Sequence, residues 1–190
     1  VIERKGARVA FMTPAGFGDM FLIGKEQRTP EEIFDVRYRR PPQLVPRGMV
    51  VEIEERVDAS GEVLTPLSEP EVERAAAAIA KLAPEAVAIC LLHGYANPSH
   101  EQRLATAVRK RLLDAYVTTS SEVWPEIGEY ERAATTVTSA YIGPMFARYV
   151  NQLSDTISAS GIKASLQIMQ SSGGIMPGSA AARKAVYTVE

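Results

Sequence analysis

The chain has 190 residues, of which 46% are hydrophobic and 23% charged, and its 21 basic and 23 acidic side chains give a formal net charge of −2. These ordinary globular values exclude a disordered, collagen-like or coiled-coil chain and indicate about one domain with a real core. So small a net charge gives no reason to expect nucleic acid or an anionic membrane as a partner.

Two further features bear on location and on the extent of the chain. The longest unbroken apolar run, Ala86 to Leu92, is seven residues, whereas a membrane span needs about 20. A single cysteine excludes an internal disulfide framework and favours a cytoplasmic setting. The chain begins at Val1 without an initiator Met or a signal-like segment and ends on the strand-like stretch 187–190. We therefore expect an internal fragment of a larger protein.

Residues 1–67 are rich in proline and carry short alternating apolar stretches, which predicts a β-rich, loop-rich part. The expected elements are strands at 8–13 and 49–57, a turn at 58–61, a returning hairpin arm at 62–64 and a short helix at 29–34.

From Ser68 onward the pattern changes to alternating helices and strands. Ser68 and Glu71 form a capping-box pattern, and Pro84 ends the helix that follows. The segment 86–92 is apolar at both odd and even positions, as in a strand of a parallel sheet covered on both faces. The remaining expected elements are a helix with Asn97 as its cap and Pro98 at its first position, a strand at 116–119, a helix at 129–141 that Gly143 and Pro144 restart or kink, a strand at 165–169 and a helix at 179–184. This order predicts an α/β fold with a parallel sheet.

Ligands of such sheets bind beyond the carboxyl ends of the strands. Polar turns follow the three strands expected after residue 68, at 93–97, 120–122 and 170–174. Parallel strands would bring these turns to one edge, which is the best indication of a site.

The first turn offers His93, which could be a general acid or base, a metal ligand, or a residue that only bonds to backbone. A metal pair with His100 has weak support, and no zinc spacing is present, so we expect no metal site. Cys90 lies inside the apolar strand and is expected to be a buried, unreactive thiol.

The third turn, Gln170–Gly174, joins an amide, two hydroxyls and two glycines that could cradle an anion or a carbonyl group, or could simply serve a tight turn. It is neither a Walker A sequence nor GxSxG, and the Gly16-Phe17-Gly18 segment lacks the third glycine of a dinucleotide fingerprint.

The segment 122–132 concentrates four carboxylates and one arginine. Such a segment is usually the solvated start of a helix, although Glu129, Tyr130 and Arg132 could reach a cleft from it.

Several strings resemble the hydantoinase A/5-oxoprolinase family, which includes N-methylhydantoinase, 5-oxoprolinase and components of acetone and acetophenone carboxylases. In chain order they are ERKGARVAFMTPAGFGD, DVRYRRPPQLVPR, ERVDASGEVLTPL, AVAICLLHGYANPSHEQR, SSEVWPEIGEYERAATTVTSAYIGP and IMQSSGGIM. The resemblance runs over essentially the whole chain. It implies an actin-like and sugar-kinase-like ATPase fold.

The same resemblance implies ATP-dependent phosphorylation of a cyclic-amide carbonyl, followed by ring opening with a hydantoinase B-type subunit or domain. Members of the family carry DxGGTxTD-like and SGPAGG-like phosphate loops, and neither string occurs in these residues. ATP and Mg²⁺ are therefore expected for the parent enzyme, with no cofactor bound by this chain. Two departures, Ser172 in place of Asn and Ser139 in place of Asn, leave the substrate open.

The change of pattern at Ser68 and the resemblance together divide the chain into 1–67 and 68–139, two parts of the N-terminal region, and 140–190, the start of the core domain. We expect the parent enzyme to be oligomeric and, from the single cysteine, cytoplasmic. The residues expected to line the substrate side of a cleft are His93, Glu122, Glu129, Arg132, Gln170, Ser171, Ser172, Gly173 and Gly174. Arg132 is expected to stabilise phosphate or carbonyl charge. The alternatives are a component of an ATP-dependent ketone carboxylase or, for the isolated chain, an inactive folding and interface module.

Overall fold

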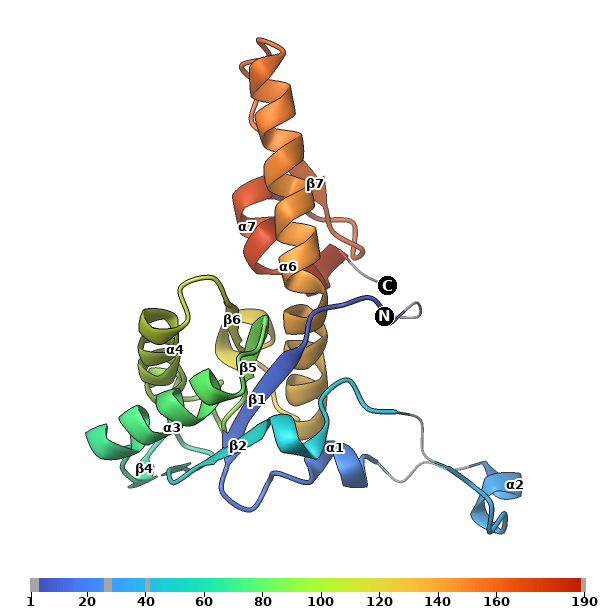
Figure 1. Cartoon of the computed structure of the whole chain (residues 1–190), viewed down its shortest axis with the longest axis vertical. Coiled ribbons are helices and arrows are strands. Elements are labelled where there is room, and N and C mark those ends of the chain that lie inside the picture. Colours follow the sequence, from blue (N-terminus) through green and yellow to red (C-terminus); the bar gives the residue numbers. More distant parts are fainter. Residues whose placement is uncertain (1–3, 26–28, 40–41, 189–190) are drawn as a thin grey trace.

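The protein is described by a computed structural model that covers residues 4–25, 29–39 and 42–188. Its centre is a four-stranded sheet in the order β2-β1-β5-β6, in which every neighbouring pair is parallel (Figure 1). The strands are β1 (Val9–Pro14), β2 (Val50–Ile53), β5 (Ala86–Ile89) and β6 (Tyr116–Thr119). All four carboxyl ends therefore meet at one edge.

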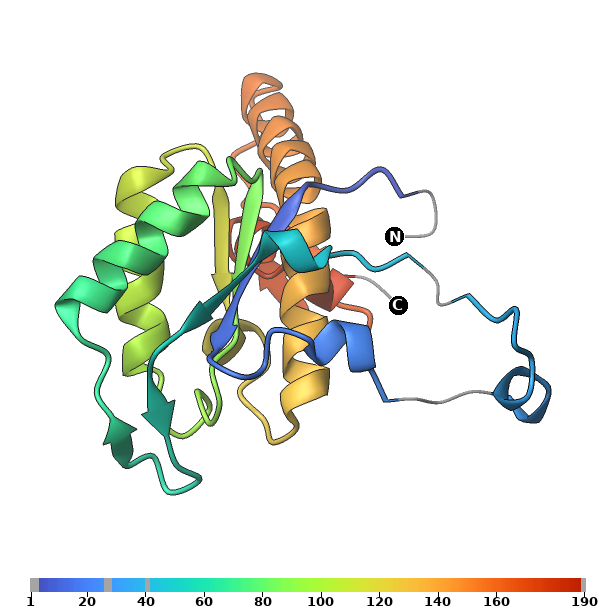
Figure 2. The same cartoon turned by 60° about the horizontal axis from the view of Figure 1, so that its bottom comes forward.

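Helices cover both faces of this sheet (Figure 2). On one face α3 (Glu69–Lys81) and α4 (Ser99–Arg111) pack against Ala10 and Met12, and on the other α6 (Glu129–Ala159) packs against Val9 and Phe11. Successive side chains of a strand point to opposite faces, so a strand between two helical layers must be apolar at every position. The burial of the whole of β5 confirms this interpretation of its sequence.

The first part of the chain contributes to the same sheet. The predicted strand 49–57 is divided into β2 and β3 (Arg56–Val57), and β3 pairs with β4 (Val63–Thr65) in the antiparallel hairpin expected at 62–64. Short helices α1 (Met20–Ile23), α2 (Pro30–Ile33) and η1 (Arg47–Met49) lie in the connections. In α2 the Thr29 and Glu32 side chains form a complete capping box, which explains the short helix predicted there.

The predicted helix starts are confirmed in part. Ser68 Oγ accepts a hydrogen bond of 3.3 Å from the Glu71 amide, as expected for the cap of α3. Helix α4 begins at Ser99 with Pro98 at the cap position, one residue later than predicted. Asn97 instead accepts from the Ser99 amide at 3.1 Å and donates to the Gly61 carbonyl at 3.0 Å, which ties this turn to the β3–β4 hairpin.

The prediction of a third parallel strand at 165–169 is wrong. Strand β7 (Gln167–Met169) pairs antiparallel with β8 (Ile175–Pro177) in a separate hairpin, followed by α7 (Gly178–Arg183) and η2 (Ala185–Thr188). Gly173 has a φ of 89°, which permits the chain to reverse directly after β7. The short strand is only partly buried, so it has no need of helices on both faces.

Helix α6 runs unbroken through Gly143 and Pro144, where the sequence predicted a restart or kink. Its first part packs on the sheet, and its later part extends away beside α7 and β7 (Figure 1). In the described part of the chain, no helix combines the length and apolar character needed to cross a membrane.

Candidate functional site

A cleft of about 590 Å³ lies at the carboxyl edge of β1 and β5. It is bounded by the turn after β1, by α1, by the turn after β5 and by the first residues of α6. Its lining residues are Gly16, Phe17, Asp19, Met20, Ile23, Gly24, Leu92, His93, Glu129 and Tyr130. A polar-edged pocket of this size, beyond the ends of parallel strands, suits one small molecule.

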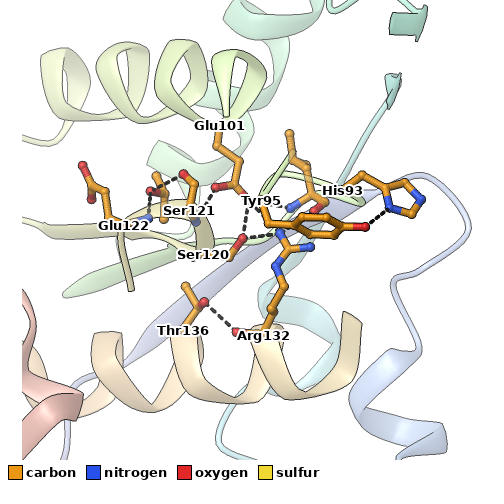
Figure 3. Close-up of polar contacts among 10 residues, drawn as sticks. His93, Tyr95, Glu101, Ser120, Ser121, Glu122, Arg132 and Thr136 are labelled. Atoms are coloured by element: carbon orange, nitrogen blue, oxygen red, sulfur yellow. Dashed lines mark hydrogen bonds and ion pairs between the residues drawn. The ribbon is translucent and has the colours of Figure 1, made fainter. Parts of the chain in front are cut away.

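His93 is held in this cleft by a constrained turn. Its φ is 53°, in the left-handed region that non-glycine residues seldom adopt. Its carbonyl accepts from the amides of Ala96 and Asn97 at 2.8 and 3.1 Å. Its ring Nδ1 lies 3.2 Å from the hydroxyl of Tyr95 (Figure 3). The strained backbone and the hydrogen bond together fix the direction of the imidazole.

Directly behind the cleft lies an ion pair with no solvent exposure, Glu101 of α4 and Arg132 of α6. Arg132 Nη2 is 3.6 Å from Glu101 Oε1 and donates to the Leu91 carbonyl at 2.8 Å and to the Ser120 hydroxyl. Glu101 accepts from the Leu91 amide at 2.9 Å, from the Ser120 hydroxyl at 2.6 Å and from the Ser121 amide at 2.9 Å (Figure 3). The pair therefore joins the ends of β5 and β6.

Two contacts couple this ion pair to the His93 turn. A Cβ added to Gly94 would lie 2.7 Å from Glu101 Oε1 and 2.9 Å from Arg132 Nη2, so only glycine fits against the pair. The ring of Tyr95 lies over the guanidinium of Arg132, with 5.4 Å between Cζ and the ring centroid (Figure 3). Residues 93–95 are thus packed on a buried charged support.

The structure brings together only some of the predicted site residues. His93 and Glu129 both line the cleft, whereas Arg132 is buried behind it. The Glu122 side chain is half-exposed and lies 3.7 Å from Arg109, on the opposite side of the ion pair from His93 (Figure 3). The first two turns lie on either side of the ion pair at the same edge of the sheet, as expected. Ser120 and Ser121 of the second turn donate to Glu101, and the ring of Tyr95 in the first turn lies over Arg132.

The third predicted turn, Gln170–Gly174, lies at the tip of the β7–β8 hairpin and lines no part of this cleft. The amide and hydroxyl of Ser171 both donate to the Tyr187 carbonyl at 3.0 Å, and Ser172 Oγ lies 3.4 Å from Gln170 Oε1. The hydroxyl of Tyr187 in turn donates to the Val123 carbonyl at 2.6 Å, at the end of α5 (Ser120–Val123). Because β7 belongs to another sheet, the predicted convergence of all three turns is wrong.

The sequence indicated the turns that contain Tyr95 and Ser120 but gave neither residue a role of its own, and it gave no role in the site to Glu101. Glu101 precedes Leu104 and Val108 by three and seven residues, so it shares their apolar helix face. An acidic residue on that face must be buried and paired. This spacing is the signal in the sequence that indicates a buried, paired carboxylate at position 101.

The remaining candidates have structural explanations. Cys90 is buried, and burial raises the pKa of its thiol to about 12, as expected for an unreactive residue. His100 Nδ1 lies 2.7 Å from Glu55 Oε2 in a second buried pair, away from His93. Within residues 4–25, 29–39 and 42–188, no group of three or more His, Cys, Asp or Glu side chains could hold a metal ion.

Family models match both parts of the chain: "Hydantoinase/oxoprolinase N-terminal region" over residues 1–112 and "Hydantoinase/oxoprolinase" over residues 132–190. The chain belongs to the hydantoinase/oxoprolinase family, as its sequence indicated.

Two relatives and two solved structures illustrate this membership. The chain is 32% identical to the alpha subunit of the caprolactamase of Pseudomonas jessenii, over 100% of this chain and 27% of that protein. It is 31% identical to 5-oxoprolinase of Saccharomyces cerevisiae, over 93% of this chain and 15% of that protein. The chain superposes on nucleotide-free acetone carboxylase with a TM-score of 0.84 and 25% sequence identity. It superposes on the ATP-dependent caprolactamase of P. jessenii with a TM-score of 0.80 and 31% sequence identity. Each superposition covers 98% of this chain and 28% of the other chain.

These structural matches confirm the α/β, ATPase-like fold class. The chain spans about a quarter or less of the length of these relatives.

Proposed function

We propose that the chain is part of an ATP-dependent cyclic-amide hydrolase of the hydantoinase/5-oxoprolinase type, which activates a ring carbonyl by phosphorylation before the ring opens. The observation that carries this proposal is the cleft beyond β1 and β5, with His93 and Glu129 on its walls. Family membership and the similarity to caprolactamase and 5-oxoprolinase support the reaction class.

The lining of the cleft suits a small cyclic amide. A ring carbonyl accepts hydrogen bonds and a ring N–H donates them, so one side chain of each kind can orient the ring. The imidazole of His93 can donate to the carbonyl oxygen, and the Glu129 carboxylate can accept from the ring N–H. Phe17, Met20 and Tyr130 supply apolar surface for the carbon atoms of the ring.

The sequence predicts that this chain holds neither ATP nor Mg²⁺ by itself. The chain contains no Walker A sequence, and its described residues form no metal-binding group. We therefore propose that other parts of the enzyme bind the nucleotide and the metal, and we assign the cleft only to binding and orienting the ring. The boundary at residue 140 between the N-terminal region and the core domain stays a prediction.

Partner subunits are part of the same proposal. Similar proteins are named as subunits, among them the alpha subunit of caprolactamase and the beta subunit of acetone carboxylase. We propose a hydantoinase B-type partner, an oligomeric parent enzyme and a cytoplasmic location, the last because the single cysteine is a buried free thiol.

The test is ADP release by the full-length protein, which is purified with any co-encoded partner and assayed with MgATP. The substrates are hydantoin, 5-oxoproline and caprolactam, each compared with no added substrate. The proposal predicts that at least one cyclic amide raises ADP release about tenfold or more and yields a ring-opened product. Unchanged ADP release with all three would contradict it.

A component of a ketone carboxylase is the second candidate, favoured by the TM-score of 0.84 with acetone carboxylase. The same assay distinguishes the two reactions when acetone or acetophenone is added with and without bicarbonate. ADP release that requires both a ketone and bicarbonate would favour the carboxylase.

A third candidate concerns the isolated chain, which would be an inactive folding and interface module of the enzyme. Calorimetric titration of MgATP into the 190 residues tests it. No binding heat is expected, and tight binding would contradict the assignment of the nucleotide site to other parts of the enzyme.

A further inference from the structure

Tyr95 lies between the buried ion pair and the histidine of the cleft. One face of its ring covers the Arg132 guanidinium, and its hydroxyl lies 3.2 Å from Nδ1 of His93 (Figure 3). Among the residues labelled in Figure 3, Tyr95 is the only one that contacts both Arg132 and His93. What fixes Tyr95 therefore also fixes the imidazole.

The Arg132 guanidinium is buried beneath the Tyr95 ring. It has no solvent exposure, and its Nη2 is held by Leu91, Ser120 and Glu101. Within the described residues, its Nε and Nη1 atoms have no hydrogen-bond partner although they are buried. A planar cation that lacks partners gains most from an aromatic face, since the electron-rich ring offsets part of the lost hydration. The ring and the hydroxyl of Tyr95 therefore have separate roles, the ring against Arg132 and the hydroxyl against His93.

The direction of the hydrogen bond between the Tyr95 hydroxyl and Nδ1 of His93 is linked to which imidazole nitrogen carries the proton. A neutral imidazole has one N–H donor and one bare acceptor nitrogen. Among the described residues, Nδ1 of His93 is the only hydrogen-bond partner of the Tyr95 hydroxyl, and Nε2 of His93 has none. When the hydroxyl donates to Nδ1, the proton of the imidazole must lie on Nε2, the nitrogen left for the cleft.

We propose that Tyr95, supported by Arg132, is a positioning residue that keeps His93 in the Nε2–H tautomer, so that His93 donates a hydrogen bond to a carbonyl oxygen bound in the cleft. The carbonyl as ligand rests on the proposed function, whereas the tautomer does not. A donor fixed in place before substrate binds stabilises negative charge on such an oxygen without reorganising.

The first experiment measures the tautomer without any substrate. The 190-residue chain contains only two histidines, His93 and His100. Labelling histidine with ¹⁵N therefore allows nitrogen–proton correlation spectra to report the protonation of each ring nitrogen, with a His93→Asn variant for assignment. The proposal predicts a proton on Nε2 and a bare Nδ1 for neutral His93. A proton on Nδ1 would overturn it.

Variants separate positioning from simple stability. Tyr95→Phe keeps the ring over Arg132 and removes the hydroxyl, and it should convert the single His93 tautomer into a mixture while the His100 signals stay in place. Tyr187→Phe is the matched control, because it removes a hydroxyl bonded to a carbonyl at 2.6 Å elsewhere in the fold. An unchanged His93 spectrum in Tyr95→Phe, or the same change in the control, would overturn the proposal.

A kinetic experiment tests the connection to substrate. In the full-length enzyme, Tyr95→Phe should lower kcat for the cyclic amide about tenfold, with KM within about twofold, since misorientation of a group acts on the transition state. A rise in KM at constant kcat would contradict the role in orienting His93. If no cyclic amide is turned over at all, the proposed function fails, but the spectra still decide whether Tyr95 positions His93.

Discussion

A charged pair buried between two strand ends is costly unless its hydrogen bonds are nearly complete. Glu101 meets this condition with two amides and one hydroxyl, and it holds Arg132 beside the Leu91 carbonyl. The turn at Gly94, which packs against this pair, is therefore held in place, because neither Glu101 nor Arg132 can shift without losing these hydrogen bonds.

Gly94→Ala tests this packing. Its new Cβ would meet Glu101 Oε1 at 2.7 Å, so we expect the free energy of unfolding to fall by about 1–3 kcal/mol. Denaturant unfolding of the chain measures the change. Gly48→Ala is the control, since a Cβ there meets nothing within 4 Å, and it should change stability by less than about 0.5 kcal/mol. Equal stability of the two variants would show that the turn is not packed on the ion pair.

At the scale of elements, Glu71 joins α3 to the segment after β2. Its carboxylate accepts from the Glu54 amide at 2.9 Å and forms hydrogen bonds of 2.6 Å with Arg74. The hydrogen bond to Arg74, together with that amide, lowers the pKa of Glu71 below its ordinary value of 4.5. The stabilisation is therefore complete above about pH 4.5 and is lost as the pH falls through the lowered pKa.

Glu71→Gln should consequently lower the melting temperature near neutral pH and lose less stability than the wild type on acidification. Thermal unfolding between about pH 7 and pH 3 measures both effects. Glu69→Gln, which changes an exposed acid on the same helix, is the control and should follow the wild-type curve. Parallel curves for the wild type and Glu71→Gln would contradict the linkage.

The packing of Gly143 shows why α6 continues at a position where the sequence predicted a restart or kink. A Cβ at this position would lie 2.5 Å from the ring of Tyr116, and the hydroxyl of Tyr116 is bonded to the Arg183 carbonyl at 2.6 Å. The glycine therefore serves close packing of α6 against β6 and does not end the helix.

Gly143→Ala should accordingly destabilise the protein by about 1–3 kcal/mol, although alanine favours helix by about 1 kcal/mol over glycine. Adding Tyr116→Leu should remove most of the steric cost, which a double-mutant cycle of unfolding free energies would reveal. A stabilising single variant would mean that the ring yields to the new methyl group.

Local patterns predicted the elements well where a single cause acts. The predicted apolar strand segment 86–92 contains the fully buried strand β5, which ends at Ile89, and the Ser68 cap is also observed. Neither prediction needs knowledge of the rest of the fold. The strand predicted at 165–169 was placed in the wrong sheet, because the sequence of a short strand does not determine its pairing partner. The reversal of the chain at Gly173 pairs β7 with β8 instead. His93 and Glu129 were predicted for the cleft, but the Tyr95–Arg132 contact joins two segments whose distance only the fold sets.

At the scale of the whole molecule, three observations support the proposal that the chain is part of a cyclic-amide hydrolase. They are the parallel sheet, the cleft at its carboxyl edge and the similarity to caprolactamase. In the proposed reaction, a side chain binds the carbonyl oxygen of the ring. His93 lines the cleft, and the contact between Tyr95 and Arg132 lies behind it.

The most direct test of this account is the rate of cyclic-amide-dependent ADP release by the full-length enzyme carrying His93→Ala. Loss of a preorganised donor to the carbonyl oxygen should lower kcat/KM by about 100-fold or more. The control is Glu73→Gln, which changes an exposed acid of α3 paired with Arg111. A His93→Ala enzyme that stays within about threefold of the wild-type kcat/KM would contradict the assignment of the cleft as the substrate site.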